Sequence, residues 1–413
     1  MWQEEKVKKV FRRIELFQNA MVQTQKALTA LPAISPINKG IGEVKKAAYV
    51  KKLLQQIGFD SIDEYRAPDR TAPCGYRPNL IARLRGRNHS KTIWIISHLD
   101  VVPTGPKNLW KTDPYKMVQK DGKIYGRGVE DNQQAIVTSI YAVKAMKDLK
   151  LVPEYDVGLA FLADEETGSD YGIRYLLKNE NLFSRDDIII IPDSGSSDSR
   201  KIEIAEKSIL WLKITTQGKQ CHASMPHKGI NAHRAGAHLL CHLDKILHQR
   251  FKRKDKIFNP PISTFEPTKK EANVENVNTI PGDDVFYIDC RVMPQYDLTA
   301  VKKIIKQEST HLEKKFGVKF TFTVQTEASA PATPASAPAV NMLKQAIHYV
   351  TNRKPILVGI GGGTFAAHFR KAGYSAVVWS TLEESCHQPN EYCVIKNMLT
   401  DTRVFAYLFS GRV

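Results

Sequence analysis

The sequence predicts an α/β domain that is interrupted by a smaller α+β domain, and three observations carry this prediction. Apolar β-type runs alternate with helical patterns up to Ala205, which is typical of a domain built on a largely parallel sheet. The pattern then changes to strand–helix–strand–helix–strand. An Ala/Pro-rich connector follows at 328–340, after which α/β alternation resumes. The expected ranges are 1–206 and 328–413 for the two parts of the α/β domain and 207–327 for the insertion.

The first part of the chain shows clear periodicity. Apolar residues at helical spacing predict one long amphipathic helix from residue 1 to about residue 31, and a second helix over 44–57 that ends at Gly58. Continuous apolar runs predict strands at 92–97, 157–163 and 187–191. Helical patterns near 132–149 and 170–180 lie between these strands.

The insertion and the last part of the chain are predicted in the same way. Within the insertion, strands are expected at 209–216, 284–292 and 317–325, and helices at 231–250 and 298–315. The amphipathic strand at 209–216 is the candidate edge of this domain's sheet. After the connector, helices are expected at 340–352, 364–372 and 391–409, and strands at 355–359 and 375–380.

The chain is basic, with a formal net charge of +17. Such a charge could indicate binding to nucleic acid or to an anionic surface. However, Lys and Arg are spread along the whole chain, and the denser stretches have helical patterns, which favours solvated helix faces. We therefore expect no nucleic-acid partner. A positive field also suits a small substrate that carries a carboxylate.

Three further features bear on location. No apolar run reaches the roughly 20 residues that a membrane-spanning helix needs, so no membrane association is expected. The N-terminal segment has no apolar core of a secretory signal. Six cysteines are scattered without CxxC pairs, which is typical of reduced thiols in a cytoplasmic protein.

Chemistry-bearing side chains follow the ends of the predicted strands. His98 and Asp100 end the first of these strands and project to the same side, because successive side chains alternate between faces. This arrangement suits an imidazole that binds a metal while a carboxylate orients it. On its own, the pair is more simply explained by a strand-end histidine bonded to loop backbone.

Further acids and a second histidine occur at corresponding positions. Asp131 opens a predicted helix, where it could simply be an N-cap. Glu165 and Glu166 follow one predicted strand together with a third acid, and Asp193 follows another predicted strand. His387 lies in a polar loop. The carboxyl ends of parallel strands form one crevice, so these groups are expected to converge. So many carboxylates in one crevice require cations. Oxygen and nitrogen ligands without cysteine suit zinc, then cobalt or manganese, and the number suits two divalent ions per subunit.

With these residues in place, the sequence resembles the M20 family of metallopeptidases, which includes succinyl-diaminopimelate desuccinylases, acetylornithine deacetylases, aminoacylases, glutamate carboxypeptidases and carnosinase-type dipeptidases. The matching segments occur in the family's order and cover nearly the whole chain: SHLDVVP (97–103), YGRGVED (125–131), DEETGS (164–169), PDSG (192–195), GKQCHASMPHKGINA (218–232), NTIPG (278–282), GGGT (361–364) and HQPNE (387–391).

The resemblance implies a three-layer, zinc-peptidase-like catalytic domain with an inserted ferredoxin-like lid and dimerisation domain. It implies that Glu165 acts as general base and then acid, and that Asp100 orients His98. It also implies five metal ligands, with Asp131 bridging two ions, His98 and Asp193 completing one site, and Glu166 and His387 completing the other.

The resemblance also assigns residues in the insertion and in the last part of the chain. His222 would reach across a homodimer to stabilise the oxyanion of the reaction. The groups expected to bind a substrate carboxylate are Asn278, Arg291, Gly362, Gly363 and Thr364. The chain departs from the family's pattern after Asp131, where Met-Lys-Gly is often found and this sequence has Asn132-Gln133-Gln134.

The implied function is hydrolysis of an amide bond in a small N-acyl amino acid or dipeptide-like substrate, as in the desuccinylase and deacetylase branch. A dipeptidase or carboxypeptidase with the same site is the alternative within the enzymes. A basic nucleic-acid-binding protein, or a non-catalytic member of the family, is the alternative from another class.

Overall fold

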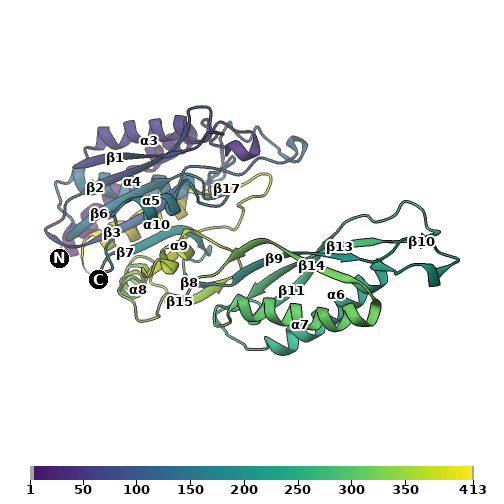
Figure 1. The fold of residues 1–413 in the computed structure, drawn as a ribbon. Coiled ribbons are helices and arrows are strands. Elements are labelled where there is room, and N and C mark those ends of the chain that lie inside the picture. The colour runs from purple at the N-terminus through teal and green to yellow at the C-terminus, as the bar shows by residue number, and fades with distance from the viewer. Residues whose placement is uncertain (1–3, 412–413) are drawn as a thin grey trace. The chain divides into compact units, whose positions relative to one another are not determined.

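The computed structural model describes residues 4–411, which form two compact units (Figure 1). The α/β unit contains the chain up to Ile204, Thr333–Val358 and the chain from Thr364 onward. The inserted unit contains Ala205–Ala332 and Gly359–Gly363. The inserted unit thus extends beyond the range 207–327. It also takes in a short glycine-rich segment that the sequence alone placed in the α/β domain.

The α/β unit is built on an eight-stranded sheet in the order β1-β2-β6-β3-β7-β16-β8-β15. Its strands are β1 (Ser61–Pro68), β2 (Tyr76–Leu84), β3 (Asn88–His98), β6 (Tyr155–Leu162), β7 (Ile188–Gly195), β8 (Lys201–Glu206), β15 (Ile356–Ile360) and β16 (Ala376–Ser380). The central strands β6, β3, β7 and β16 run parallel. The pairs β1–β2, β2–β6 and β16–β8 are antiparallel. The expected parallel arrangement therefore holds for the four central strands and not for the whole sheet. The sequence did not indicate the outer strands β1 and β8, because their polar sequences do not show continuous apolar runs.

Helices cover both faces of this sheet, giving three layers (Figure 1). They are α1 (Glu4–Glu15), α2 (Gln18–Thr29), α3 (Val44–Ile57), α4 (Gln133–Asp148), α5 (Ile173–Asn179), α8 (Pro338–Thr351), α9 (Phe365–Lys371) and α10 (Ile395–Phe409). Trp94 and Ile96 of β3 pack with α5 and α9, while α4 contacts β3 and β6 and is itself covered by α10. Both faces of the central strands are buried, which explains their continuous apolar runs.

The first predicted helix was wrong in one respect. It is divided into α1 and α2 at Leu16 and Phe17, and Leu16 is exposed. The apolar spacing from Val7 to Met21 continues across the division, so periodicity alone did not show it. By contrast, α3 ends as predicted at Gly58, which adopts a left-handed conformation with φ of 82°.

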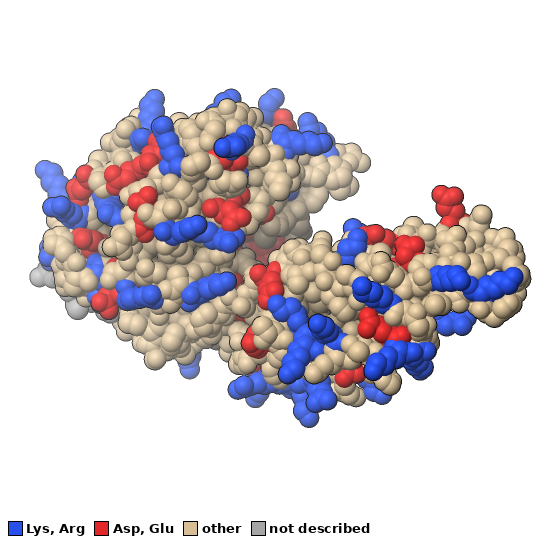
Figure 2. All heavy atoms as spheres, in the orientation of Figure 1, with Lys and Arg blue, Asp and Glu red and all other residues tan. Residues whose placement is uncertain are grey.

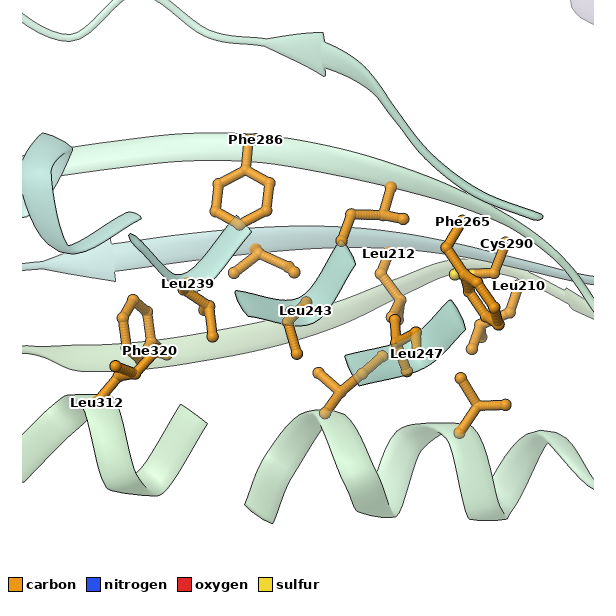
Figure 3. Close-up of a cluster of buried hydrophobic side chains, with 14 of the residues drawn as sticks. Leu210, Leu212, Leu239, Leu243, Leu247, Phe265, Phe286, Cys290, Leu312 and Phe320 are labelled. Carbon is orange, nitrogen blue, oxygen red and sulfur yellow. The ribbon is translucent and has the colours of Figure 1, made fainter. Parts of the chain in front are cut away.

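The inserted unit has the chain order strand–helix–strand–strand–helix–strand. Its elements are β9 (Ser208–Gln217), α6 (Ala232–Arg250), β11 (Thr264–Lys270), β13 (Asp283–Val292), α7 (Leu298–Phe316) and β14 (Lys319–Ala328). The sheet order β11-β13-β9-β14 and its antiparallel pairs give a ferredoxin-like fold. Leucines of α6 and α7 pack against apolar side chains of the sheet (Figure 3).

One prediction about this sheet was wrong. The strand expected at 209–216 is β9, which lies between β13 and β14, so it is not an edge. The edges are β14 and β11. The sequence missed β11 because its residues, Thr-Phe-Glu-Pro-Thr-Lys-Lys, are mostly polar and exposed.

The remaining elements are short. A three-stranded sheet contains β4 (Val118–Lys120), β5 (Lys123–Tyr125) and β17 (Tyr392–Val394), and a two-stranded antiparallel sheet in the inserted unit contains β10 (Cys221–His222) and β12 (Thr279–Ile280). Three 3-10 turns lie at Pro36–Asn38, Lys107–Leu109 and Pro226–Lys228. Over residues 4–411, every helix is too short or too polar to span a bilayer.

On the face shown in Figure 2, Lys and Arg side chains are distributed over both units, with Asp and Glu among them. This distribution matches the dispersed basic residues of the sequence.

Candidate metal centre

Polar side chains gather at the carboxyl ends of the parallel strands of the α/β unit. His98 ends β3, Glu165 and Glu166 follow β6, and Asp193 lies near the end of β7. Asp131 precedes α4, and His387 lies in the loop after β16. Because β3, β6, β7 and β16 run in the same direction, their ends share one edge of the sheet. The structure therefore brings together the five residues that the sequence suggested as metal ligands.

Asp131 lies between two imidazoles. Its Oδ1 is 2.9 Å from Nε2 of His98, and its Oδ2 is 3.1 Å from Nε2 of His387. Asp193 Oδ1 lies 3.5 Å from His98 Nε2, and Glu166 Oε2 lies 3.1 Å from His387 Nε2. The site thus contains two groups of three ligand atoms, each within 4.8 Å of one another, that share one carboxylate.

The chemistry of these groups fits divalent cations. Each group offers one imidazole nitrogen and two carboxylates, which are ligands that zinc, cobalt and manganese accept. In addition, the Oε1 atom of Glu166 is buried without a hydrogen-bond partner among residues 4–411. A cation at this position would satisfy an acceptor that the described chain leaves unsatisfied.

The pKa values of these side chains in the metal-free protein reflect the short distances between the charged groups. Hydrogen bonds with Asp131 and Glu166 raise the pKa of His387 to about 10. Burial, followed by the charge of Asp131, raises the pKa of Glu166 to about 7. Burial would also raise the pKa of Asp131, but its hydrogen bonds with His387 and His98 hold it below its usual range. Burial and the charge of Asp193 hold the pKa of Glu165 well above its usual range.

Asp100 holds both His98 and the acidic turn after β6. The Nδ1 atom of His98 lies 3.1 Å from the Asp100 carbonyl oxygen and 3.4 Å from its Oδ1. The backbone N–H groups of Glu165 and Glu166 donate to the two carboxylate oxygens of Asp100, each at 3.1 Å. Asp100 is completely buried, so this carboxylate fixes the ring and the two acids relative to one another.

Sequence reasoning missed Glu391, a buried carboxylate that holds the turn carrying Asp131. Its Oε1 accepts the N–H groups of Glu130 and Asp131 at 2.9 and 3.2 Å. Its Oε2 accepts from the Gly128 N–H at 2.9 Å and from Arg127 Nη1 at 2.7 Å. The only signal in the sequence was its place in the HQPNE segment, which does not show what it contacts.

Glu130 was also missed, and it connects the two loops that carry Asp131 and His387. Its carboxylate accepts the N–H groups of Glu383 and Ser385, at 2.5 and 2.6 Å, and the Ser385 hydroxyl at 2.6 Å. These contacts join segments that are more than 250 residues apart in the chain. Such a connection is decided by the tertiary structure.

Asn132, where the chain departs from the family's pattern, connects two candidate ligands. Its Nδ2 donates to the Pro192 carbonyl at 2.8 Å and to Asp193 Oδ1 at 3.1 Å. Its Oδ1 accepts the N–H of His98 at 3.4 Å. The peptide bond between Asp131 and Asn132 is cis.

The residues suggested in the insertion lie in the inserted unit. His222 is exposed on β10, and its Nδ1 accepts from the Ser224 N–H at 3.2 Å. Asn278 lies beside it, since the Ala223 N–H donates to the Asn278 carbonyl at 2.8 Å. The pairing of β10 with β12 therefore brings these two residues together.

Arg291 lies on β13 and is already held by two partners. Its Nε and Nη2 donate to the carboxylate of Asp289, at 2.8 and 3.1 Å, and its Nη1 donates to the Gly361 carbonyl at 2.7 Å. Gly362 and Gly363 follow in the inserted unit. Thr364 begins the next segment of the α/β unit, where its hydroxyl caps α9 by accepting the Ala366 N–H at 3.1 Å.

Comparison with known proteins decides the family. Residues 94–410 match peptidase family M20/M25/M40. The chain belongs to this family. M20 enzymes use divalent metal ions, and this chain is a hydrolase of amide or peptide bonds. A non-catalytic or nucleic-acid-binding role has no support from the fold or from the comparisons.

The names of similar proteins differ in how specific a function they state. An uncharacterised metallohydrolase of Methanocaldococcus jannaschii is 39% identical over 408 residues, covering 95% of this chain and 99% of the relative. A succinyl-diaminopimelate desuccinylase of Roseobacter denitrificans is 25% identical over 371 residues, covering 88% and 91%. Among solved structures, human carnosine dipeptidase 1 matches with a TM-score of 0.76 at 19% identity, over 98% of each chain, which shows a shared fold.

The raised pKa of His387 predicts proton release when a metal ion binds. The His387 ring is protonated at neutral pH in the metal-free protein, with a pKa of about 10, whereas an imidazole must be neutral to bind a metal. Protons therefore compete with the ion, and we expect affinity for zinc to fall as pH decreases from about 8 to about 6. Calorimetric titration in buffers of different ionisation enthalpy measures this release. Replacement His387→Gln should reduce it, and an affinity that is independent of pH would contradict the prediction.

Proposed function

We propose that this M20 enzyme is a deacylase that holds two divalent ions, most simply zinc, and hydrolyses the amide bond of a small N-acyl amino acid. The observation that carries the proposal is the Asp131 carboxylate shared by the two groups of ligand atoms, because a bridging carboxylate is typical of two-metal hydrolases. The desuccinylase of Roseobacter denitrificans, which matches over most of both chains, supports an acylated amino acid as substrate.

The proposed mechanism gives each acid a separate task. Bound divalent ions would polarise the amide carbonyl and make water easier to deprotonate. Glu166 and Asp193 would hold ions, whereas Glu165 would be left to carry a proton. Because burial raises its pKa, Glu165 is suited to take a proton from water and to return it to the leaving amine. The hydrogen bond from its backbone N–H to Asp100 fixes Glu165 beside Glu166.

Six further residues complete the proposal for the substrate. Asn278, Arg291, Gly362, Gly363 and Thr364 are proposed to bind the substrate carboxylate. Arg291 is oriented for this by Asp289 and by the Gly361 carbonyl. His222 is proposed to stabilise the oxyanion that forms at the amide carbon.

We also propose a homodimer in which the inserted units pair. The inserted sheet has β11 and β14 as its two edge strands. The outer side of an edge strand offers backbone groups to which a strand of a second copy could hydrogen-bond. In such a dimer His222 of one copy would serve the site of the other. A monomer in analytical ultracentrifugation at assay concentration would contradict this proposal.

We propose a cytoplasmic location because the cysteines are free thiols. All six, at positions 74, 221, 241, 290, 386 and 393, are free in the structure. Free thiols are typical of proteins in a reducing compartment.

Removal and return of metal tests the proposed function. The protein stripped with chelator should lose amide hydrolysis and regain it with zinc, cobalt or manganese. A substrate panel of N-succinyl and N-acetyl amino acids and of dipeptides then measures specificity. We expect kcat/KM to be highest for an N-acyl amino acid. Hydrolysis of dipeptides alone would replace the deacylase by a dipeptidase, and full activity without metal would remove the metal mechanism.

Replacement of Glu165 by Gln tests the proton carrier. The Glu165→Gln enzyme should keep its metal content and lose roughly 10²–10⁴-fold in kcat, because the amide cannot take up the proton. The matched control is Glu166→Gln next to it, which should instead lower the metal content. Near-normal kcat in the Glu165→Gln enzyme would exclude Glu165 from this role.

A further inference from the structure

Lys46 is a buried ammonium that the proposed mechanism does not use. It lies in the first turn of α3, and only 1% of the residue is exposed. Among residues 4–411, its Nζ has no hydrogen-bond partner. Burial of an ammonium without hydrogen bonds is costly, so the fold must offset that cost in some other way.

The surroundings of α3 show which groups could offset it. Glu43, immediately before α3, and Asp100 together bind three successive N–H groups of the acidic turn after β6. Asp164 donates to Glu43 Oε1 at 3.4 Å, and the next two residues donate to Asp100. The Glu43 and Asp100 carboxylates therefore lie against the same short turn. Lys46 is three residues after Glu43, so it lies on the same side of the helix.

The two carboxylates differ in their cationic partners. Glu43 forms a buried, two-pronged ion pair with Arg77. Asp100 is completely buried, and among residues 4–411 the structure gives it no Lys or Arg ion pair, although its charge also acts on Arg77. It faces His98, which would be neutral when it holds a metal ion.

Carboxylates near α3 oppose the effect of burial on Lys46. Burial lowers the pKa of Lys46 to about 8, while the charges of Asp100, Glu43, Glu391 and Asp131 act in the opposite direction, with Asp100 first. A protonated Lys46 and these carboxylates therefore attract one another. Since the interaction is mutual, it stabilises the carboxylates as much as the ammonium.

We propose that Lys46 is a positioning residue of the metal centre, whose buried ammonium stabilises the Asp100 carboxylate that holds His98 and the backbone of Glu165 and Glu166. The role is indirect, because Lys46 contacts neither ion nor substrate. The inference rests on the proposed metal centre. It goes beyond it by assigning a residue outside every segment that carries the family resemblance.

Replacement of Lys46 by Met tests the proposal, since Met keeps a similar length and removes the charge. Competition titrations with zinc and with cobalt should show affinity weakened by roughly 10–100-fold, the usual effect of losing a group behind a metal ligand. The visible absorption of the cobalt-loaded protein should change as well. By contrast, the metal-free variant should unfold at the same or a higher denaturant concentration, because a buried unbonded charge has been removed.

Two further variants make the outcome decisive. Lys52→Met, on the exposed side of the same helix, should leave affinity, spectrum and stability unchanged. If the Met variant folds poorly, Lys46→Gln replaces it, because this variant removes the charge and keeps a polar end. Wild-type affinity and spectrum in either folded Lys46 variant would overturn the inference. So would a loss of metal-free stability that matches the loss of affinity, or failure of both variants to fold, since either shows a structural role. If the wild-type protein itself binds neither ion, the proposed function fails together with this inference.

Discussion

The structure of the site depends on the concentration of negative charge around Asp131. One carboxylate faces two imidazoles, and further acids lie immediately beside them. Such an arrangement is unfavourable in a partly dry environment unless every group is held and cations are present. The surrounding chain meets the first condition with buried side chains that bind backbone N–H groups. Asp100 holds the turn after β6, Glu391 holds the turn before α4, and Glu130 joins that turn to the loop of His387.

The same constraint explains the distribution of cations beneath the site. Arg77 and Arg127 each pair with a buried glutamate that binds loop backbone, and Lys46 is buried close to the same acids. Fixed positive charges on the scaffold offset the carboxylates that hold the loops, so that bound ions would need to offset only the candidate ligands.

Much of the site was predictable because parallel strands impose a simple rule. Continuous apolar runs identified β3, β6 and β7, and polar residues just after each run had to meet at one edge of the sheet. The ordered motifs then supplied family and fold. Prediction failed where pattern carries no signal. The division between α1 and α2 preserves the apolar spacing, β11 is polar because it is an exposed edge, and β9 is internal although its alternation resembles that of an edge strand.

The sequence by itself determined the fold class, the ferredoxin-like insertion, the family and the candidate ligands His98, Asp131, Glu166, Asp193 and His387. These follow from periodicity and from short motifs, both of which are local properties of the chain. Only the tertiary structure decided that the two oxygens of Asp131 face different histidines, and that Glu130, Glu391 and Lys46 lie behind the site. Those facts depend on contacts between segments hundreds of residues apart, and no local pattern specifies which buried charge will meet which loop.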